Sequence, residues 1–206
     1  MPISYITREL RQATAARCVP RLEYPEFSMP VQIGGKSHSF SEPTGLLSDC
    51  HRRIEMFLGS LVRVAPLVGK HLEGDTRTAM ETSLRYFREA APKHTADEEE
   101  SLFPRLRKMD NPEVESALGT LDPLQRDHRR ADRLHAQVDR LGRKCLEEGS
   151  LSSEEAREFT NAVSELASIY KEHIRVEDEL VFPVAGKVLS SIDKAAIAAE
   201  MAARRK

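Results

Sequence analysis

The sequence predicts an all-α protein: an antiparallel four-helix bundle with an N-terminal extension and a short C-terminal helix. Two observations favour this fold class. Charged residues make up 31 % of the chain and aromatic residues only 5 %, while Ala, Leu, Arg and Glu, which favour helices, are abundant. From about residue 44 onward, apolar residues recur at helical spacing in four long segments joined by short connections, as in a helix bundle.

The 206 residues suffice for one domain of ordinary size with an extension. Residues 1–43 are predicted to form an N-terminal arm, and residues 44–206 the helical bundle with its C-terminal helix. A short helix over 6–17 is compatible with the arm, but helix-breaking residues interrupt the remainder of the arm, namely Pro20, Pro25, Pro30, Gly34, Gly35 and Pro43.

The first two helical segments are predicted to form one pair. The first, near 44–68, places on one face Leu47, His51, Ile54, Leu58, Leu61 and Val62. A loop from Gly69 to Gly74 comes next, and Asp75 is the expected N-cap of the second segment. The stripe of the second segment holds Met80, Leu84, Phe87, Ala91, His94, Glu98 and Leu102. Pro92 is expected to kink or split this helix, because proline removes a backbone donor.

The other two long segments are predicted to form the second pair. A short helical turn after Pro112 precedes a helix near 121–147, whose stripe holds Leu121, Leu124, His128, Ala131, His135, Val138 and Leu141. Gly149 ends that helix. Ser152 or Ser153 begins a fourth helix that runs to about Phe182, with Val163, Leu166, Tyr170, His173, Glu177 and Val181 on its stripe. Ser191 is the expected cap of a short C-terminal helix.

One motif occurs twice, displaced by 79 residues: HTADEEESLFP begins at His94 and HIRVEDELVFP at His173. In both copies Glu lies four residues after His, on the same helical face, and Phe and Pro lie nine and ten residues after His. The other two helices echo each other as well, since Asp-Cys-His51-Arg-Arg resembles Asp-His128-Arg-Arg at a displacement of 77 residues. We interpret the bundle as two helix pairs related by an old duplication.

Six polar side chains lie on faces that should be buried. They are the four histidines His51, His94, His128 and His173 and the two carboxylates Glu98 and Glu177. Burial of a polar group without a partner costs about 1–3 kcal/mol or more, and burial of a lone carboxylate costs more still. A metal centre would satisfy all six groups together. Simpler explanations exist for the individual residues. Each histidine could be a hydrogen-bonded core residue, and each His-x3-Glu could be an i,i+4 pair on a solvent-exposed helix face.

The ligand types favour iron over zinc. Zinc sites usually have four ligands, often with thiolates, whereas Cys18, Cys50 and Cys145 fall into no ligating pattern. Four imidazoles and two carboxylates shared by two metals suit iron, with Glu98 and Glu177 as the natural bridges. Ferritin-like bundles use Glu-x-x-His pairs instead, so that fold is disfavoured.

The chain resembles the hemerythrin-like, or HHE cation-binding, domain family over about residues 44–185. The resemblance rests on His51, His94-x3-Glu98, His128 and His173-x3-Glu177, together with the Leu-Phe-Pro and Val-Phe-Pro endings. It implies a four-helix bundle that holds two non-haem iron ions, with those six residues as ligands and both carboxylates bridging. Whether an oxo or hydroxo group also bridges the two ions is left undecided. The intervals between successive histidines are similar to those of bacterial di-iron proteins linked to the repair of iron centres.

Three further residues are candidates near the predicted centre. Oxygen-carrying members of the family have a fifth histidine one turn after the first on the third helix, where this chain has Asp132. His135, two turns along, is a candidate substitute. Tyr170, one turn before His173, either lines a pocket at the metal centre, hydrogen-bonds a bridging group, or packs in the core with its hydroxyl satisfied. Fewer nitrogen ligands weaken the expectation of reversible oxygen carriage. The repair-type proteins also carry an N-terminal cysteine domain, for which Cys18 alone is a weak counterpart.

Composition narrows the class of protein. A formal net charge of −2 disfavours nucleic-acid binding. The sequence contains no apolar segment of the kind that predicts a membrane span or a signal peptide. We therefore expect a cytoplasmic protein without a membrane or nucleic-acid partner. The oligomeric state is left open.

The predicted function is a non-haem di-iron protein that binds or senses a small diatomic or peroxide ligand: O2, NO or peroxide. The alternative is a di-iron enzyme that turns over peroxide or NO, acts as a ferroxidase, or repairs or donates iron centres. The sequence leaves open whether the chain is an enzyme at all, and it identifies no catalytic residue.

Overall fold

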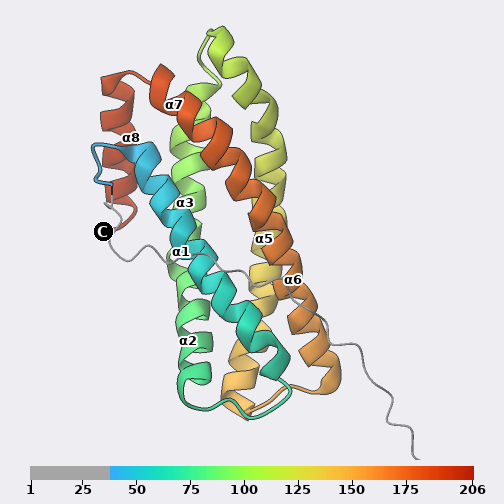
Figure 1. Ribbon diagram of the computed structural model, residues 1–206. Coiled ribbons are helices and arrows are strands. Elements are labelled where there is room, and N and C mark those ends of the chain that lie inside the picture. The colour runs from blue at the N-terminus through green and yellow to red at the C-terminus, as the bar shows by residue number, and fades with distance from the viewer. Residues whose placement is uncertain (1–37) are drawn as a thin grey trace, which may run out of the picture. The chain divides into compact units, whose positions relative to one another are not determined.

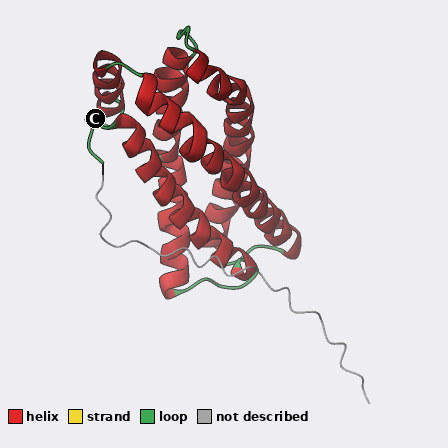
Figure 2. Ribbon diagram, turned by 45° about the horizontal axis from the view of Figure 1, so that its top comes forward, coloured by secondary structure: helices red, strands yellow, loops and turns green. Residues whose placement is uncertain are grey.

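The computed structural model describes residues 38–206, which form a helical bundle without a strand (Figures 1 and 2). The predicted arm, residues 1–43, lies outside the described residues except for 38–43. The fold class and the bundle architecture predicted from composition and periodicity are confirmed.

Four long helical rods make up the bundle. Two of them are α1, Pro43–Val64, and α5, Pro112–Glu148. Another is α2, Gly74–Glu89, continued by α3, Ala91–Ala96, the π-helical segment η2, Asp97–Leu102, and α4, Phe103–Leu106. The last is α6, Ser153–Val176, continued by η3, Glu177–Val181, and α7, Phe182–Val188. A single turn, η1, Ala65–Leu67, comes after α1, and α8, Ser191–Ala203, completes the chain.

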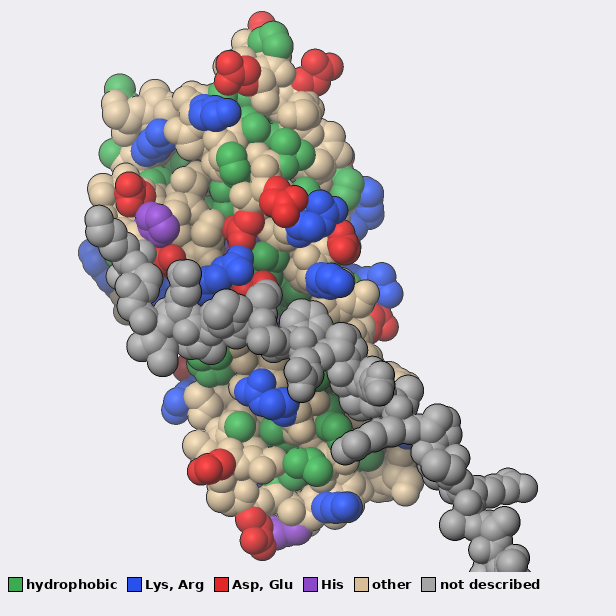
Figure 3. Space-filling model, in the orientation of Figure 1, with side chains coloured by type: hydrophobic (Ala, Val, Ile, Leu, Met, Phe, Trp, Pro, Cys, Tyr) green, Lys and Arg blue, Asp and Glu red, His purple; other side chains and the backbone are tan. Residues whose placement is uncertain are grey.

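The rods pack in a closed cycle, α1 against α2, α2 against α5, α5 against α6, and α6 against α1 (Figure 1). Acidic and basic side chains are interspersed over the face shown in Figure 3. No helix among the described residues is both long and apolar enough to cross a bilayer.

The structure corrects three expectations for α1 and α2: the burial of Val62, the N-cap at Asp75, and the loop that extends to Gly74. Val62 is 39 % exposed and lies off the buried stripe, because it comes one residue after Leu61 and therefore projects about 100° away. Glu73, not Asp75, is the N-cap of α2, and Gly74 already belongs to the helix. Asp75 instead lies in the first turn of α2, where its negative charge interacts favourably with the helix dipole. As expected, the helix breaks just before Pro92, between α2 and α3.

The third helix is longer than predicted. It begins at Pro112 rather than after a separate short turn, with the Asn111 side chain accepting a hydrogen bond from the Glu113 amide at 2.9 Å. Pro123 lies inside the helix without ending it. Buried side chains on both sides of the proline hold the rod in place, and these are Val114, Ala117, Leu121 and Leu124.

The later helices begin at hydrogen-bonding serines. Ser152 caps α6 in a reciprocal capping box with Glu155, as one of the two predicted positions requires. Ser190, not Ser191, caps α8, because its hydroxyl accepts from the Asp193 amide at 3.1 Å. The fourth rod continues past Phe182 to Val188, with the π-helical turn η3 in its middle.

The two π-helical segments were not predicted, and they contain both copies of the motif glutamate. In each, the Glu carbonyl accepts from the amide five residues on: Phe103 to Glu98, and Phe182 to Glu177. A proline comes directly after each phenylalanine. Because a proline ring crowds the carbonyl four residues earlier and cannot donate to it, a wider turn relieves the conflict. Such turns often mark functional sites.

The apolar interior consists of two clusters with a polar layer between them. One cluster lies near the α1–α2 and α5–α6 connections and includes Leu58, Met80, Leu141 and Phe159. The other lies toward α7 and α8 and includes Leu47, Phe103, Leu121 and Ile197. Along α1 the two clusters are separated at His51, and along α5 they are separated at His128. The histidines and glutamates predicted as ligands lie in that layer.

The C-terminal helix is tied to the first π-helical segment. Asp97 is fully buried, and its carboxylate accepts hydrogen bonds from Arg204, at 2.9 Å, and Arg205, at 2.5 Å. Arg204 also donates to the Ser101 hydroxyl at 2.9 Å, and Arg105 binds Glu200 through two hydrogen bonds. These contacts fix the backbone immediately before Glu98.

Asp97→Ala should destabilise the fold. Removing one member of a buried ion pair costs about 3–5 kcal/mol, and since both guanidiniums keep partial solvent contact we expect about 2 kcal/mol here. The free energy of unfolding from urea titration tests this. Glu100→Ala is the matched control, because Glu100 also pairs with Arg204 but is exposed, so its loss should cost less than about 0.5 kcal/mol. Equal effects of the two substitutions would contradict the assignment.

Candidate metal centre

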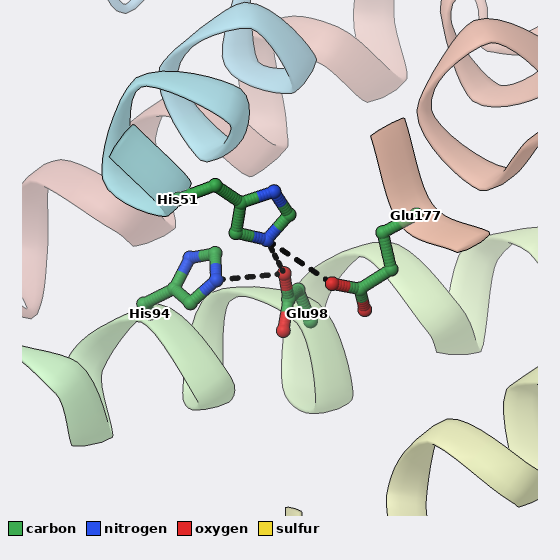
Figure 4. Close-up of side chains that lie close together, drawn as sticks. All are labelled: His51, His94, Glu98 and Glu177. Carbon is green, nitrogen blue, oxygen red and sulfur yellow. Dashed lines mark ion pairs between the residues drawn. The ribbon is translucent and has the colours of Figure 1, made fainter. Parts of the chain in front are cut away.

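The structure brings the six predicted ligands into one buried site. Two overlapping groups of potential metal ligands occur among the described residues. Group A comprises His51, His94, Glu98 and Glu177, and Figure 4 shows its side chains converging from α1, α3, η2 and η3. Group B comprises His128, His173, Glu98 and Glu177. Both glutamates belong to both groups, which is the geometry expected of bridging carboxylates.

Distances within each group are close to those between neighbouring ligands of one metal ion. In group A, His94 Nε2 lies 3.1 Å from Glu98 Oε1, and His51 Nε2 lies 3.1 Å from Glu177 Oε2. In group B, His128 Nε2 lies 3.3 Å from Glu98 Oε2. His173 Nε2 lies 3.2 Å from Glu177 Oε2. Metal–ligand bonds of roughly 2.0–2.2 Å bring adjacent ligand atoms to about 3 Å from one another.

These close approaches leave polar atoms unsatisfied. Glu98, Glu177 and His51 are fully buried, yet neither carboxylate nor His51 Nε2 has a partner at hydrogen-bonding angles. The atoms converge on common points rather than pairing off. Buried polar atoms are nearly always hydrogen-bonded, so the exceptions require an explanation. A cation at each convergence point would satisfy them, and the donor set of imidazole nitrogen and carboxylate oxygen fits a transition metal.

Acidic residues bind two of the imidazoles at Nδ1, the ring nitrogen that does not face the other candidate ligands. His51 Nδ1 lies 2.9 Å from Asp178 Oδ1, and Asp178 also accepts from Ser48 and Arg52. His128 Nδ1 lies 2.7 Å from Glu99 Oε1. A hydrogen bond at Nδ1 turns Nε2 toward the site as a metal-binding atom. Sequence alone does not distinguish this role of Glu99 and Asp178 from a place on a solvent-exposed helix face, and the structure assigns both to imidazole orientation.

The motif phenylalanines stack on the same two histidines. Phe103 lies nearly parallel to His128, at an interplanar angle of 10°, and Phe182 to His51, at 17°. Glu99 and Phe103 come from the first copy of the motif, whereas Asp178 and Phe182 come from the second. Each copy therefore orients the histidine of the opposite helix pair. This explains why the repeat extends beyond His and Glu.

Charges in the metal-free site balance through protonated histidines. Burial alone would lower the pKa of His128, but the close Glu98 carboxylate and the hydrogen bond with Glu99 outweigh burial and raise that pKa to about 10. Burial would also lower the pKa of His51, but its hydrogen bond with Asp178 and the nearby Glu177 carboxylate raise that pKa well above its usual value. Burial would raise the pKa of Glu98, but the surrounding imidazoles hold it well below the usual range.

His94 differs from the histidines held by acids. Burial lowers its pKa to about 4, so its imidazole is neutral and its Nε2 is free to bind a cation. Its Nδ1 has no partner among the described residues, and the same is true of His173 Nδ1, which lies 3.7 Å from Asp127. His128 and His173 share a hydrogen bond between their Nε2 atoms, 3.0 Å apart, where a cation would replace the proton.

The three additional candidates lie outside both groups. His135 Nε2 lies 3.0 Å from the Tyr170 hydroxyl oxygen, and its ring stacks on Phe87. Burial lowers the pKa of His135 to about 4 and, together with nearby carboxylates, raises the pKa of Tyr170. Asp132 is exposed and lines the same surface pocket as His135 and Tyr170. Cys50 and Cys145 are buried free thiols outside the site.

Comparison with known proteins places this geometry in a family. The sequence model of the hemerythrin HHE cation binding domain matches residues 42–185. The chain belongs to that family. It is also 30 % identical, over 171 residues, to an uncharacterized protein of Haemophilus influenzae, with 81 % of this chain and 92 % of that protein covered. The family and the His/Glu cluster together indicate binding of iron or another cation.

Binding of a cation should release protons. His51 and His128 hold protons at neutral pH that must leave before Nε2 can coordinate, so affinity should rise with pH up to about 10, the pKa of His128. Calorimetric titration with Fe²⁺ under anaerobic conditions, in buffers of different ionisation enthalpy, measures the release. His135→Gln is the control and should release as many protons as the wild type, because His135 is already neutral. Heats that do not depend on the buffer would contradict this charge assignment.

Glu99→Gln and Asp178→Asn should each lower cation affinity by roughly 10–100-fold, since partners of metal-bound histidines commonly contribute that much. Chelator competition measures the affinity, and circular dichroism checks that the bundle persists. The neighbouring acids Glu100 and Glu179 are exposed, so Glu100→Gln and Glu179→Gln serve as controls with little expected effect. Similar losses in all four variants would show that general charge, not imidazole orientation, matters.

Proposed function

We propose that the chain binds two iron ions at this site, one in each group, with Glu98 and Glu177 bridging them. The observation that carries the proposal is the shared use of both buried carboxylates by two pairs of histidines. A single ion would leave one histidine pair without a partner. Nitrogen and oxygen ligands without thiolate suit iron better than a structural zinc site.

We further propose that the centre binds or senses a small ligand: O2, NO or peroxide. Each group offers two imidazoles and two bridging carboxylates, which leaves coordination positions free on an ion that prefers six ligands. Iron supplies the redox and ligand-binding chemistry. The residues of this chain position it, exclude bulk water from the buried layer and balance its charge.

A di-iron enzyme is the second candidate. The Tyr170 hydroxyl and the His135 imidazole line a surface pocket, and the Tyr170 ring packs against His173. These groups could deliver a proton during peroxide or NO turnover. Turnover assays with hydrogen peroxide, NO and Fe²⁺ on the iron-loaded protein separate the candidates. Rates no greater than those of free iron would favour binding or sensing.

Iron content and optical spectra test the proposed function. Anaerobically reconstituted protein should contain two iron ions per chain, and air should produce oxo-bridge or carboxylate-to-iron absorption that dithionite removes. Addition of O2, NO or peroxide should then change the spectrum. Protein that takes up no iron, or whose spectrum ignores all three ligands, would overturn the proposal.

Glu98→Gln should abolish stoichiometric iron binding while the helical circular dichroism persists. The amide keeps the shape of the side chain but removes the charge and the bridging ability of the carboxylate. Glu100→Gln, two residues along and exposed, should retain iron. If Glu98→Gln instead unfolds the protein and iron-loaded wild type ignores every ligand, the metal has a structural role.

A further inference from the structure

We infer that a small surface pocket between α2–α3, α5 and α6 is where an exogenous ligand approaches the metal centre, and that the Tyr170 hydroxyl donates a hydrogen bond to that ligand. This inference rests on the proposed function, because it presumes a metal ion at group B. Beyond that function, we assign the metal position that the ligand approaches, the route to that position, and the side chain that recognises the ligand.

The pocket lies between α2–α3, α5 and α6. Its volume is about 210 Å³, and its lining includes Phe87, Thr95, Asp132, His135, Ala136 and Tyr170. Pockets for drug-sized organic ligands measure roughly 300–1,000 Å³, so this pocket suits a ligand of only a few heavy atoms. Its size fits the small oxygen and nitrogen species of the proposed function.

One side chain of the pocket, Tyr170, packs against a group B histidine. Tyr170 is one turn before His173 on α6, and its ring meets the His173 imidazole edge-on with centroids 6.3 Å apart. Asp132 is one turn after His128 on α5, and Thr95 comes directly after His94. The pocket therefore borders elements that carry three of the four histidines, while His51 lies on α1, away from its lining.

In the duplicated half of the bundle, the counterparts of Tyr170 and His135 are apolar. In the repeat, Tyr170 corresponds to Ala91 and His135 to Leu58, both apolar and buried. The corresponding positions near group A thus provide no hydroxyl and no imidazole. Ala91 lines the same pocket, so the Tyr170 hydroxyl and the His135 imidazole enter it from α6 and α5, the helices that carry the group B histidines.

The hydrogen bonds of the pair leave the Tyr170 proton available. His135 Nδ1 is buried and has no partner among the described residues. A proton there would be a buried unpaired donor, so the favoured tautomer carries its proton on Nε2 and donates to the Tyr170 oxygen 3.0 Å away. That oxygen has no other partner among the described residues. The hydroxyl hydrogen is thus free to point into the pocket toward an acceptor atom of a ligand.

Azide titration of the oxidised, iron-loaded protein tests the inference, with charge-transfer absorption as the readout. Tyr170→Phe removes the hydroxyl and keeps the ring, and it should weaken azide binding about threefold to tenfold, the worth of one hydrogen bond. Tyr86→Phe is the matched control, because Tyr86 donates to the Cys50 carbonyl at 3.5 Å and lines no part of the pocket. The azide stretching frequency should shift in D2O for the wild type and not for Tyr170→Phe.

A second variant tests the route. Ala136 is exposed and lines the pocket, so Ala136→Trp should slow azide association and dissociation by the same factor, with little change in affinity. Thr78→Trp places the same indole in a separate surface pocket between α1 and α2 and should leave both rates unchanged.

The outcomes separate this inference from the proposed function. Protein without iron overturns the proposed function, and the inference falls with it. Iron-loaded protein in which Tyr170→Phe and Ala136→Trp bind azide like their controls overturns the inference alone. Because the D2O shift is measured on the wild type, its absence counts against the hydrogen bond even if a variant fails to fold.

Discussion

The structure depends on one constraint: two ionised carboxylates and four imidazoles form a layer between two apolar clusters, away from water. Burial of a carboxylate is tolerated only when positive charge accompanies it. In the metal-free protein, protons on His51 and His128 provide that charge. Metal ions would provide it in their place. Cation binding and proton release are therefore two descriptions of the same charge balance.

In this layer, each copy of the repeat contacts and orients a histidine of the other helix pair. The first copy supplies His94 and Glu98 as candidate ligands, and its Glu99 and Phe103 hold His128 on α5. The second copy does the same for His51 on α1 through Asp178 and Phe182. Neither pair can complete its own half of the site. The arrangement couples assembly of the bundle to assembly of the site.

Two departures from this symmetry make polar contacts that the other half lacks. Asp97 on η2, where the second copy has Val176, binds the C-terminal arginines Arg204 and Arg205 and so ties α8 to the segment that presents Glu98. Tyr170 and His135 form a polar pair beside group B, where the repeat has apolar residues. The duplicated core thus provides the candidate ligands, and the later differences provide an anchor on one side and an approach on the other.

The sequence by itself determined the helical class, the four rods and the six candidate ligands, because helical periodicity and a duplicated His-x3-Glu spacing are local properties that need no knowledge of packing. It could not determine the π-helical turns at Glu98 and Glu177, the continuity of α5 through Pro123, or the roles of Glu99 and Asp178. Those depend on contacts between segments far apart in the chain. Only the tertiary structure decided that an acid beside each glutamate orients a histidine of the opposite pair, since that contact exists only once the helices have packed.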